Sequence, residues 1–298
     1  MTMATRVGFI SEKGGVGKTT ACYHIATCLS QEHDKDVLVV DTDYQRGGIT
    51  GRFLPDLIEH FRGGELPGTT LNTKFQQLYS GQRVTTEVDV RETQEGPDLI
   101  AADPRLAQVT VEKMPGSNSI RVNNQHLWNH LSLLDTVLRR FDDEYDYILI
   151  DSHPDISDVL RCVIYACDYC VSPVKLDLQS TIGVATAVEA INEVNADVAM
   201  IHHAIPGLVR RDPAQFVGAM GMMSREWGGN LKQTEWAEFR RLQRSGGIFE
   251  NYVTEGDGLR QAARDRVPVF QVKGANAEKQ SQQFRDLTTE FITKCPQK

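Results

Sequence analysis

A glycine-rich loop between an apolar run and a helical pattern is the feature that most constrains the fold of this chain. The loop covers residues 13–20, follows the apolar run 7–10 and precedes a segment typical of a helix, 19–29. Glycines let successive backbone N–H groups converge on a phosphate, and the start of a helix adds partial positive charge. A strand, a glycine loop and a helix in this order predict a phosphate-binding site in an α/β fold.

Two lysines and a threonine in the loop carry the expected chemistry. Lys18 should meet the β- and γ-phosphates of a nucleotide, and the hydroxyl of Thr19 should ligate Mg²⁺. Glu12 stands where the usual phosphate loop has its first glycine, and a second lysine, Lys13, follows it. A glycine-rich turn with stray lysines is the alternative, which the strand–loop–helix order disfavours. The predicted nucleotide-binding residues are Lys13, Gly14, Gly15, Val16, Gly17, Lys18, Thr19 and Thr20.

Carboxylates follow two other apolar runs. Asp41 and Asp43 come after the run 37–40, and Asp151 comes after the run 147–150. Carboxylates at the carboxyl ends of parallel strands lie at the ligand-binding edge of a sheet. Asp41 is expected to orient or activate the attacking water, Asp43 to support the Mg²⁺ shell or the loop, and Asp151 to bind Mg²⁺. A charged turn after a strand is the alternative for the first pair.

These segments together resemble the ParA/MinD family of ATPases, particularly ParA-type partition and McdA-like cargo-positioning proteins. Residues 13–20 resemble the family's deviant Walker A box, and 148–151 resemble Walker B. Residues 41–45 match Asp-x-Asp-Pro-Gln, with Tyr44 in place of proline, which removes a restraint on the backbone. The resemblance implies that Lys13 reaches across a dimer interface to the partner's nucleotide. Lys13, Lys18 and Asp41 are then the expected catalytic residues, acting on ATP with Mg²⁺.

Strand and helix patterns alternate along the chain, which predicts an α/β fold: a doubly wound, mostly parallel sheet with helices on both faces. One P-loop domain is expected over residues 1–298, because phosphate-site segments lie both near the start and in the middle. The segment 206–247 resembles the family least and is interpreted as a subfamily insertion. The expected strands are 7–10, 37–40, 99–102, 147–150, 171–174, 198–205 and 267–272, and the expected helices are 19–29, 125–141, 155–166, 180–194 and 276–294.

Charge is distributed unevenly along the sequence. The formal net charge is −8, which argues against binding of polyanions by bulk charge. Residues 231–298 nevertheless carry 12 Lys and Arg against 9 Asp and Glu, so the excess of acid lies elsewhere. Six scattered cysteines suggest a reducing cytoplasm, and no apolar run approaches the length of a membrane span. A cytoplasmic, nucleoid-associated protein is expected.

The resemblance implies a cycle in which an ATP-bound homodimer binds a surface. A small adaptor or centromere-binding protein then stimulates slow hydrolysis. Nonspecific DNA is the favoured surface, for segregating plasmid or chromosomal DNA or positioning a cargo such as carboxysomes. A MinD-like membrane ATPase is the alternative, and a metabolic P-loop enzyme would need a small-molecule pocket that no residue demands. The predicted DNA contacts are Arg260, Arg264, Lys273, Lys279 and Arg285.

Three further features bear on these alternatives. Phe284, Leu287, Phe291 and Ile292 form one apolar stripe, which favours a helix docked on the domain over a membrane-tethering tail. Cys167 and Cys170 have the spacing of a metal-ligand pair, but the chain holds no second such pair, so buried structural cysteines are favoured. His153 could sense the γ-phosphate, although a solvent-facing loop histidine is the favoured interpretation.

Overall fold

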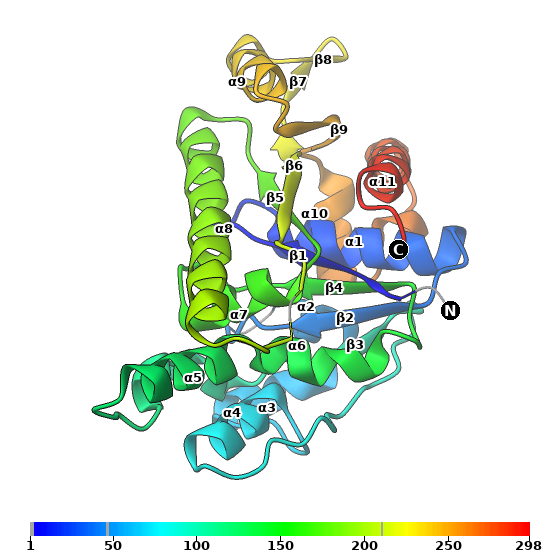
Figure 1. Ribbon diagram of the computed structural model, residues 1–298. Helices are drawn as coiled ribbons and strands as arrows, with labels where there is room; N and C mark the ends of the chain where they lie inside the picture. The colour runs from blue at the N-terminus through cyan, green and yellow to red at the C-terminus, as the bar shows by residue number, and fades with distance from the viewer. Residues whose placement is uncertain (1–2, 46–47, 210) are drawn as a thin grey trace.

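A seven-stranded sheet forms the centre of the molecule in the computed structural model, which describes residues 3–45, 48–209 and 211–298 (Figure 1). The strand order is β3-β2-β4-β1-β5-β6-β9, and all its neighbouring strands run parallel. This confirms the predicted α/β fold. The strands are β1 (Thr5–Phe9), β2 (Val37–Asp41), β3 (Asp98–Ile100), β4 (Tyr147–Asp151), β5 (Tyr169–Val174), β6 (Gln215–Ser224) and β9 (Ile248–Thr254).

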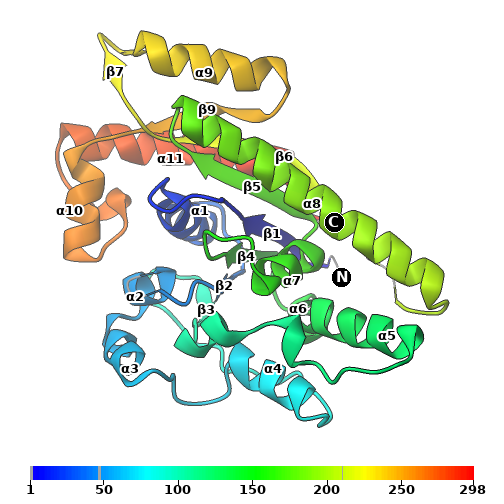
Figure 2. The same ribbon diagram turned by 90° about the vertical axis from the view of Figure 1, so that its left-hand side faces the viewer.

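Helices cover both faces of the sheet, as Figures 1 and 2 show. Every residue of β1, β2 and β4 is buried, which is why β2 and β4 are continuous apolar runs up to their final aspartates. One face packs against α1 (Lys18–Glu32), α2 (Ile49–Phe53), α3 (Ile58–Gly63), α10 (Asp257–Asp265) and α11 (Ala275–Lys294). The other packs against α4 (Leu71–Tyr79), α5 (Ile120–Leu131), α6 (Leu133–Leu138), α7 (Asp158–Ala166) and α8 (Leu178–Ala204).

Three predicted elements differ from the observed ones. The expected strand 198–205 is wrong, because most of it lies in the last turns of α8, and a short apolar run alone does not separate strand from helix. The expected strand 267–272 contains only a 3₁₀ turn, Val269–Gln271. The expected helix 125–141 is broken at Ser132, between α5 and α6.

The segment 206–247 divides into two parts. Strand β6 lies inside the sheet between β5 and β9, so this part of the segment belongs to the central sheet. The remaining residues, 225–247, form a small excursion between β6 and β9, here called the tip lobe, which Figures 1 and 2 show standing out from the end of the sheet. It consists of β7 (Glu226–Trp227), β8 (Asn230–Leu231) and α9 (Gln233–Arg244).

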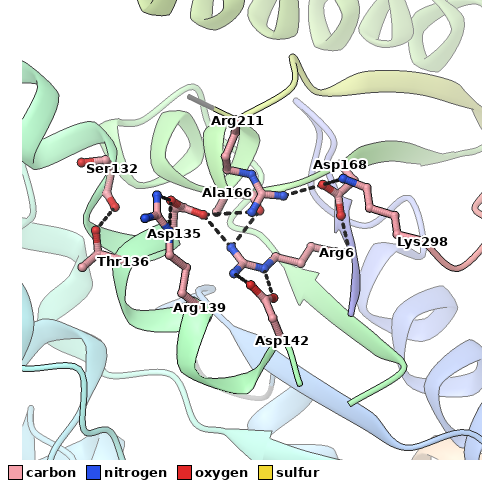
Figure 3. A network of polar contacts seen from close by, with 10 residues as sticks. All are labelled: Arg6, Ser132, Asp135, Thr136, Arg139, Asp142, Ala166, Asp168, Arg211 and Lys298. Carbon is pink, nitrogen blue, oxygen red and sulfur yellow. Dashed lines mark hydrogen bonds and ion pairs between the residues drawn. The ribbon is translucent and has the colours of Figure 1, made fainter. Parts of the chain in front are cut away.

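A buried ionic network ties the amino-terminal edge of the sheet together (Figure 3). The Arg6 guanidinium of β1 donates hydrogen bonds to Asp142 at 2.8 and 2.6 Å and to Asp135 at 2.8 Å. Its backbone N–H donates to Asp168 at 2.9 Å. Arg211 bridges Asp135, at 2.9 Å, and Asp168. The network therefore fastens the segment leading into β6 to the start of β1, far along the strands from the glycine loop.

Candidate functional site

The glycine loop encloses a cavity of about 260 Å³ at the carboxyl ends of the strands. Gly15 and Gly17 adopt left-handed φ angles of 72° and 94°. A Cβ on Gly17 would also lie 3.1 Å from the Cβ of Met222 in β6, so both conformation and space call for glycine here. The cavity is lined by Lys13, Gly14, Gly15, Gly17, Lys18, Thr19, Thr20, Asp43, Gln45, Gly48 and Pro154.

Seven of the eight loop residues predicted to contact a nucleotide thus line one cavity. The eighth, Val16, has its side chain buried away from it. The Lys13 side chain is half-buried, and no described residue forms an ion pair or hydrogen bond with its ammonium group. Lys13 is therefore free to contact a group that enters the cavity.

Lys18, Thr19 and Asp151 meet at the floor of the cavity. The Lys18 Nζ lies 2.9 Å from Asp151 Oδ1 and also donates to the backbone carbonyl of Ser152. Burial is the largest influence on Lys18 and opposes its charge, but the carboxylates of Asp151, Asp43 and Asp41 together outweigh burial and raise the pKa of the ammonium group. The Thr19 hydroxyl donates to Asp151 Oδ2 at 2.8 Å. One carboxylate therefore bridges the cation and the hydroxyl expected to hold phosphate and Mg²⁺.

The oxygen ligands at this site suit Mg²⁺ better than they suit a metal ion whose ligands all come from the protein. A hydroxyl and a carboxylate oxygen 2.8 Å apart are hard ligands spaced as neighbours around one cation, and Asp43 lines the same cavity. Among the residues that the structure describes, no three His, Cys, Asp or Glu side chains form a metal-binding group. Mg²⁺ needs few protein ligands, since it keeps waters and substrate phosphates in its shell.

Asp41 lies beside this cavity rather than in its lining. Its Oδ2 accepts hydrogen bonds from the backbone N–H and the hydroxyl of Thr50, at 2.9 and 2.6 Å. Its Oδ1 accepts one from the N–H of Asp43 at 2.9 Å. Burial, with the charge of Asp151 second, raises the pKa of Asp41 to about 7. The carboxylate therefore has the pKa of a general base near neutral pH, but both its oxygens are engaged by the protein.

Tyr44 and His153 form a stack over the cavity that the sequence did not predict. Their ring centroids are 4.0 Å apart and the planes differ by 11°. His153 is only 4% exposed, so its interpretation as a solvent-facing histidine is wrong. Its Nε2 lies 3.9 Å from Asp43, and within the described chain neither ring nitrogen has a hydrogen-bond partner. The one signal in the sequence was Tyr44 itself, which stands where the resembled motif has proline.

A second cavity, of about 270 Å³, opens at the carboxyl ends of β5 and β6. Gly17 of the first cavity lies near Met223 of the second, since a Cβ on Gly17 would lie 3.4 Å from Met223 Cε. The sequence analysis missed this site because it did not predict β6. The lining residues are Lys175, Leu176, Asp177, Met223, Arg225, Glu235 and Glu255.

The predicted DNA contacts do not form a free basic surface. Arg260 and Arg264 lie on α10, Lys279 and Arg285 on α11, and all four form ion pairs with nearby carboxylates. Only Lys273 has no ion pair within the described residues. The paired carboxylates are those of Glu255, Asp257, Asp265, Glu226 and Glu32.

The remaining sequence predictions concern buried groups. Cys167 and Cys170 are fully buried free thiols, and a Cβ on Gly8 would lie 3.0 Å from the Cys167 sulfur. This confirms the prediction of buried structural cysteines. Phe284 and Phe291 of α11 are fully buried against the sheet, which confirms that this helix is docked. Over the described residues, no helix is both long and apolar enough to cross a bilayer.

Sequence comparison matches residues 4–202 to the protein family described as an AAA domain. A ParA family protein of Chlamydia muridarum is 26% identical over 186 residues, 61% of this chain and 64% of that protein. The chromosome-partitioning ATPase Soj of Thermus thermophilus is 27% identical over 191 residues, 64% of this chain and 63% of that protein. The match thus spans less than two thirds of the length of these relatives.

Structure comparison extends the similarity over nearly the whole chain. An ATP complex of Cyanothece McdA superimposes with a TM-score of 0.72 at 15% identity, covering 98% of this chain and 97% of that one. A plasmid partition protein of Borrelia burgdorferi bound to AMPPNP gives 0.67 at 18% identity, covering 98% and 99%. A cobyrinic acid a,c-diamide synthase of Mycobacterium smegmatis, with an ATP analogue and magnesium, gives 0.66 at 16%, covering 97% and 94%. At these identities the likeness establishes a shared fold.

Proposed function

The chain belongs to the ParA family of AAA-domain ATPases, and from this membership and the geometry of its glycine loop we propose that it is an ATP-driven positioning ATPase. In this proposal residues 1–298 act as one P-loop domain. The protein binds ATP with Mg²⁺, dimerises face to face, binds nonspecific DNA as a dimer, and releases it on hydrolysis stimulated by a small adaptor or centromere-binding protein. The cargo is plasmid or chromosomal DNA or a cellular body.

The observation that carries this proposal is the meeting of Lys18, Thr19 and Asp151 beneath a left-handed glycine loop. Lys18 Nζ is held 2.9 Å from Asp151 and points into the cavity lining, where a phosphate would replace that carboxylate as its partner. Thr19 and Asp151 would hold Mg²⁺, which neutralises charge on the transferred phosphate. The protein's part is to position these groups before the nucleotide binds.

The second cavity suggests where the rest of the nucleotide lies. It adjoins the phosphate cavity across Gly17 and Met223, and it is open at the same edge of the sheet. A nucleotide whose phosphates occupy the glycine loop would extend its base over β6 toward this cavity. Both polar and apolar side chains line it, as base recognition requires.

Dimerisation is supported by what surrounds the phosphate cavity. Lys13 lines the cavity without a partner among the described residues, so its charge is available to a second subunit's phosphates. Three aliphatic side chains, Ile156, Leu178 and Ile182, are more than half exposed near the same edge. Ile156 follows the cavity residue Pro154 by two positions, and the residue after Ile182 packs near Glu12 of the loop. Exposed apolar groups around a charged centre are typical of an interface.

Hydrolysis would use Asp41. Its raised pKa of about 7 suits a group that accepts a proton from water near neutral pH. The carboxylate now accepts hydrogen bonds from the N–H and the hydroxyl of Thr50. It must give up these bonds to contact a water. Because Thr50 belongs to α2, a movement of α2 would free Asp41, and a slow basal rate is expected until a partner favours that movement.

The test is a set of three variants assayed for ATP binding, dimerisation and turnover. Lys18→Ala should lose ATP binding, because Lys18 is the buried cation at the cavity floor among the residues that the structure describes. Asp41→Asn should bind ATP and accumulate as a dimer with little turnover, because the amide keeps the packing but cannot act as a base. Lys13→Ala should bind ATP yet sediment as a monomer. Turnover of Asp41→Asn at the wild-type rate, or normal dimerisation of Lys13→Ala, would contradict the proposal.

A further inference from the structure

The outer side of α9 carries a row of basic and aromatic side chains. Lys232, Trp236, Arg240 and Arg244 follow one another at intervals of four residues, so they share one side of the helix. All four are exposed. These four residues are called the basic–aromatic stripe below. The opposite side of the helix faces the sheet and buries Glu235, Phe239 and Leu242.

The positive charges of the stripe are not neutralised by neighbours. Within the part of the chain that the structure describes, no carboxylate pairs with Lys232, Arg240 or Arg244; the Arg240 guanidinium instead donates to the amide oxygen of Gln243 at 3.2 Å. Glu235, on the same helix, faces inward and binds Arg225 at 2.7 Å. This differs from α10 and α11, whose five cations, Arg260, Arg264, Lys279, Arg285 and Lys294, are all ion-paired. The stripe is therefore a free local positive charge on a chain whose net charge is −8.

Two of the three tryptophans of the chain lie on this lobe and face solvent. Trp227 is 83% exposed beside the Gly228–Gly229 turn of the β7–β8 hairpin, whose two glycines have φ angles of 59° and 83°. Trp236 is 49% exposed, and its ring lies parallel to Phe239 at 5.8 Å and beneath the Arg240 guanidinium at 5.5 Å. Exposed indoles of this kind, of which Trp236 is held by Phe239 and Arg240, mark a recognition surface.

From this pairing of unneutralised cations with exposed indoles, we propose that the tip lobe is the DNA-contacting surface of the protein. The proposal rests on the proposed function, and it places the DNA contact on α9 instead of α10 and α11. Lys232, Arg240 and Arg244 contact backbone phosphates. The indoles of Trp227 and Trp236 pack on sugars and base faces, which is independent of sequence because every base offers an aromatic face.

The composition of the exposed side of α9 favours DNA over a lipid surface. A helix that lies in a membrane needs bulky aliphatic side chains along its apolar face. The exposed residues of α9 other than the stripe are short or polar, and its aliphatic residue Leu242 is buried. Charge complementarity and stackable rings therefore point to a nucleic acid.

The experiment compares three double variants with the wild type on a labelled duplex of arbitrary sequence, with a non-hydrolysable ATP analogue and over a salt series. Trp227→Ala/Trp236→Ala should weaken binding about tenfold, the loss expected when stacking contacts are removed. Arg240→Ala/Arg244→Ala should lower the slope of log affinity against log salt by about 2, one per phosphate contact. The control Arg260→Ala/Arg264→Ala removes the same charge from α10 and should bind like wild type.

Tryptophan fluorescence gives a second readout that a structural role would not move. Trp128 is buried, so acrylamide quenching reports mainly on Trp227 and Trp236, and the duplex should protect them. Equal DNA binding by all three variants, or loss only in the α10 control, would overturn this proposal while leaving the proposed function standing. Failure of the wild type to bind any duplex would refute the DNA step of the proposed function. If the α9 variants instead lost binding to anionic liposomes, or lost ATP-dependent dimerisation, the partner would be a membrane or a second subunit and the proposal would be wrong.

Discussion

Replacing His24 tests how the phosphate site is anchored to the far helix of the domain. His24 lies one turn after Thr20 on α1, and its Nδ1 is 2.8 Å from the Thr20 carbonyl oxygen. Its Nε2 accepts a hydrogen bond from the N–H of Val269 at 3.1 Å, and its ring stacks on Phe284 of α11 at 4.4 Å. The neutral ring can donate to the Thr20 carbonyl and accept from the Val269 N–H only when its proton is on Nδ1. A second proton, on Nε2, would face the Val269 N–H.

The pH dependence follows from this geometry. Complete burial, with the charge of Arg52 second, lowers the pKa of His24 to about 3 in the folded protein. Above pH 6.5 the ring is neutral in both the folded and the unfolded protein, so it adds nothing to the pH dependence of the free energy of unfolding. As pH falls below 6.5, the unfolded chain binds a proton that the folded chain refuses, so stability decreases by about 1.4 kcal/mol per pH unit. At pH 5 this amounts to a loss of about 2 kcal/mol relative to pH 7.5.

The assay is urea unfolding of the wild type and His24→Gln at pH 7.5 and pH 5. At pH 7.5 the variant should be less stable by about 1–3 kcal/mol, since it loses the stack and leaves a buried donor without its acceptor. At pH 5 the difference in free energy of unfolding between the wild type and the variant should be smaller by about 2 kcal/mol, because glutamine does not titrate. His60→Gln removes an exposed imidazole and serves as the control. Unfolding free energies of wild type and His24→Gln that fell in parallel with pH would refute the reasoning.

Three further predictions concern other parts of the structure. Gly17→Ala should lose ATP affinity in calorimetry and about 1–3 kcal/mol of stability, because it forces a side chain into a left-handed position 3.1 Å from Met222; unchanged binding would contradict this. Arg6→Met should lower the free energy of unfolding by about 3–5 kcal/mol in urea titrations, since it leaves the buried carboxylate of Asp142 without its cation; a loss below 1 kcal/mol would disprove that role. Tyr44→Ala should speed amide hydrogen exchange at residues 43–45 and weaken ATP binding, whereas Tyr44→Phe should preserve the stack on His153 and both properties.

Much of the phosphate site could be predicted because its chemistry lies in short local patterns. The glycine loop, Lys18 and Thr19 are contiguous, and their geometry depends on one strand, one turn and one helix. Asp41 and Asp151 could be placed because each ends a fully buried strand, and such strands are continuous apolar runs. The local sequence does not, however, specify the hydrogen bonds of Asp41 to Thr50, which depend on how α2 docks.

The elements beyond β5 could not be predicted in the same way. Strand β9 lies at the edge of the sheet, where its middle residues Glu250 and Asn251 are polar and at least partly exposed, and their backbone N–H groups donate to the Glu290 carboxylate of α11. Strand β6 contains two glycines and three methionines but only one branched residue, Val217, a composition that carries little strand signal. In the sequence, the basic–aromatic stripe on α9 is visible only as scattered basic residues. That these residues share one side of a helix, and that their charges are unpaired, becomes evident only from the structure.

The strand order explains why distant carboxylates meet at one phosphate. Strand β4 lies between β1 and β2, and its register pairs Asp151 with Phe9 on one side and with Asp41 on the other. The glycine loop starts four residues after Phe9, so Lys18 and Thr19 return onto Asp151, while Asp41 sits one strand farther out. That extra strand is the reason that Asp41 is buried beside the cavity with one oxygen bonded to Thr50 of α2, whereas Asp151 contacts the cavity residues Lys18 and Thr19. Metal binding and water activation would thus fall to different strands, so α2 can move Asp41 without disturbing the residues that hold the phosphate.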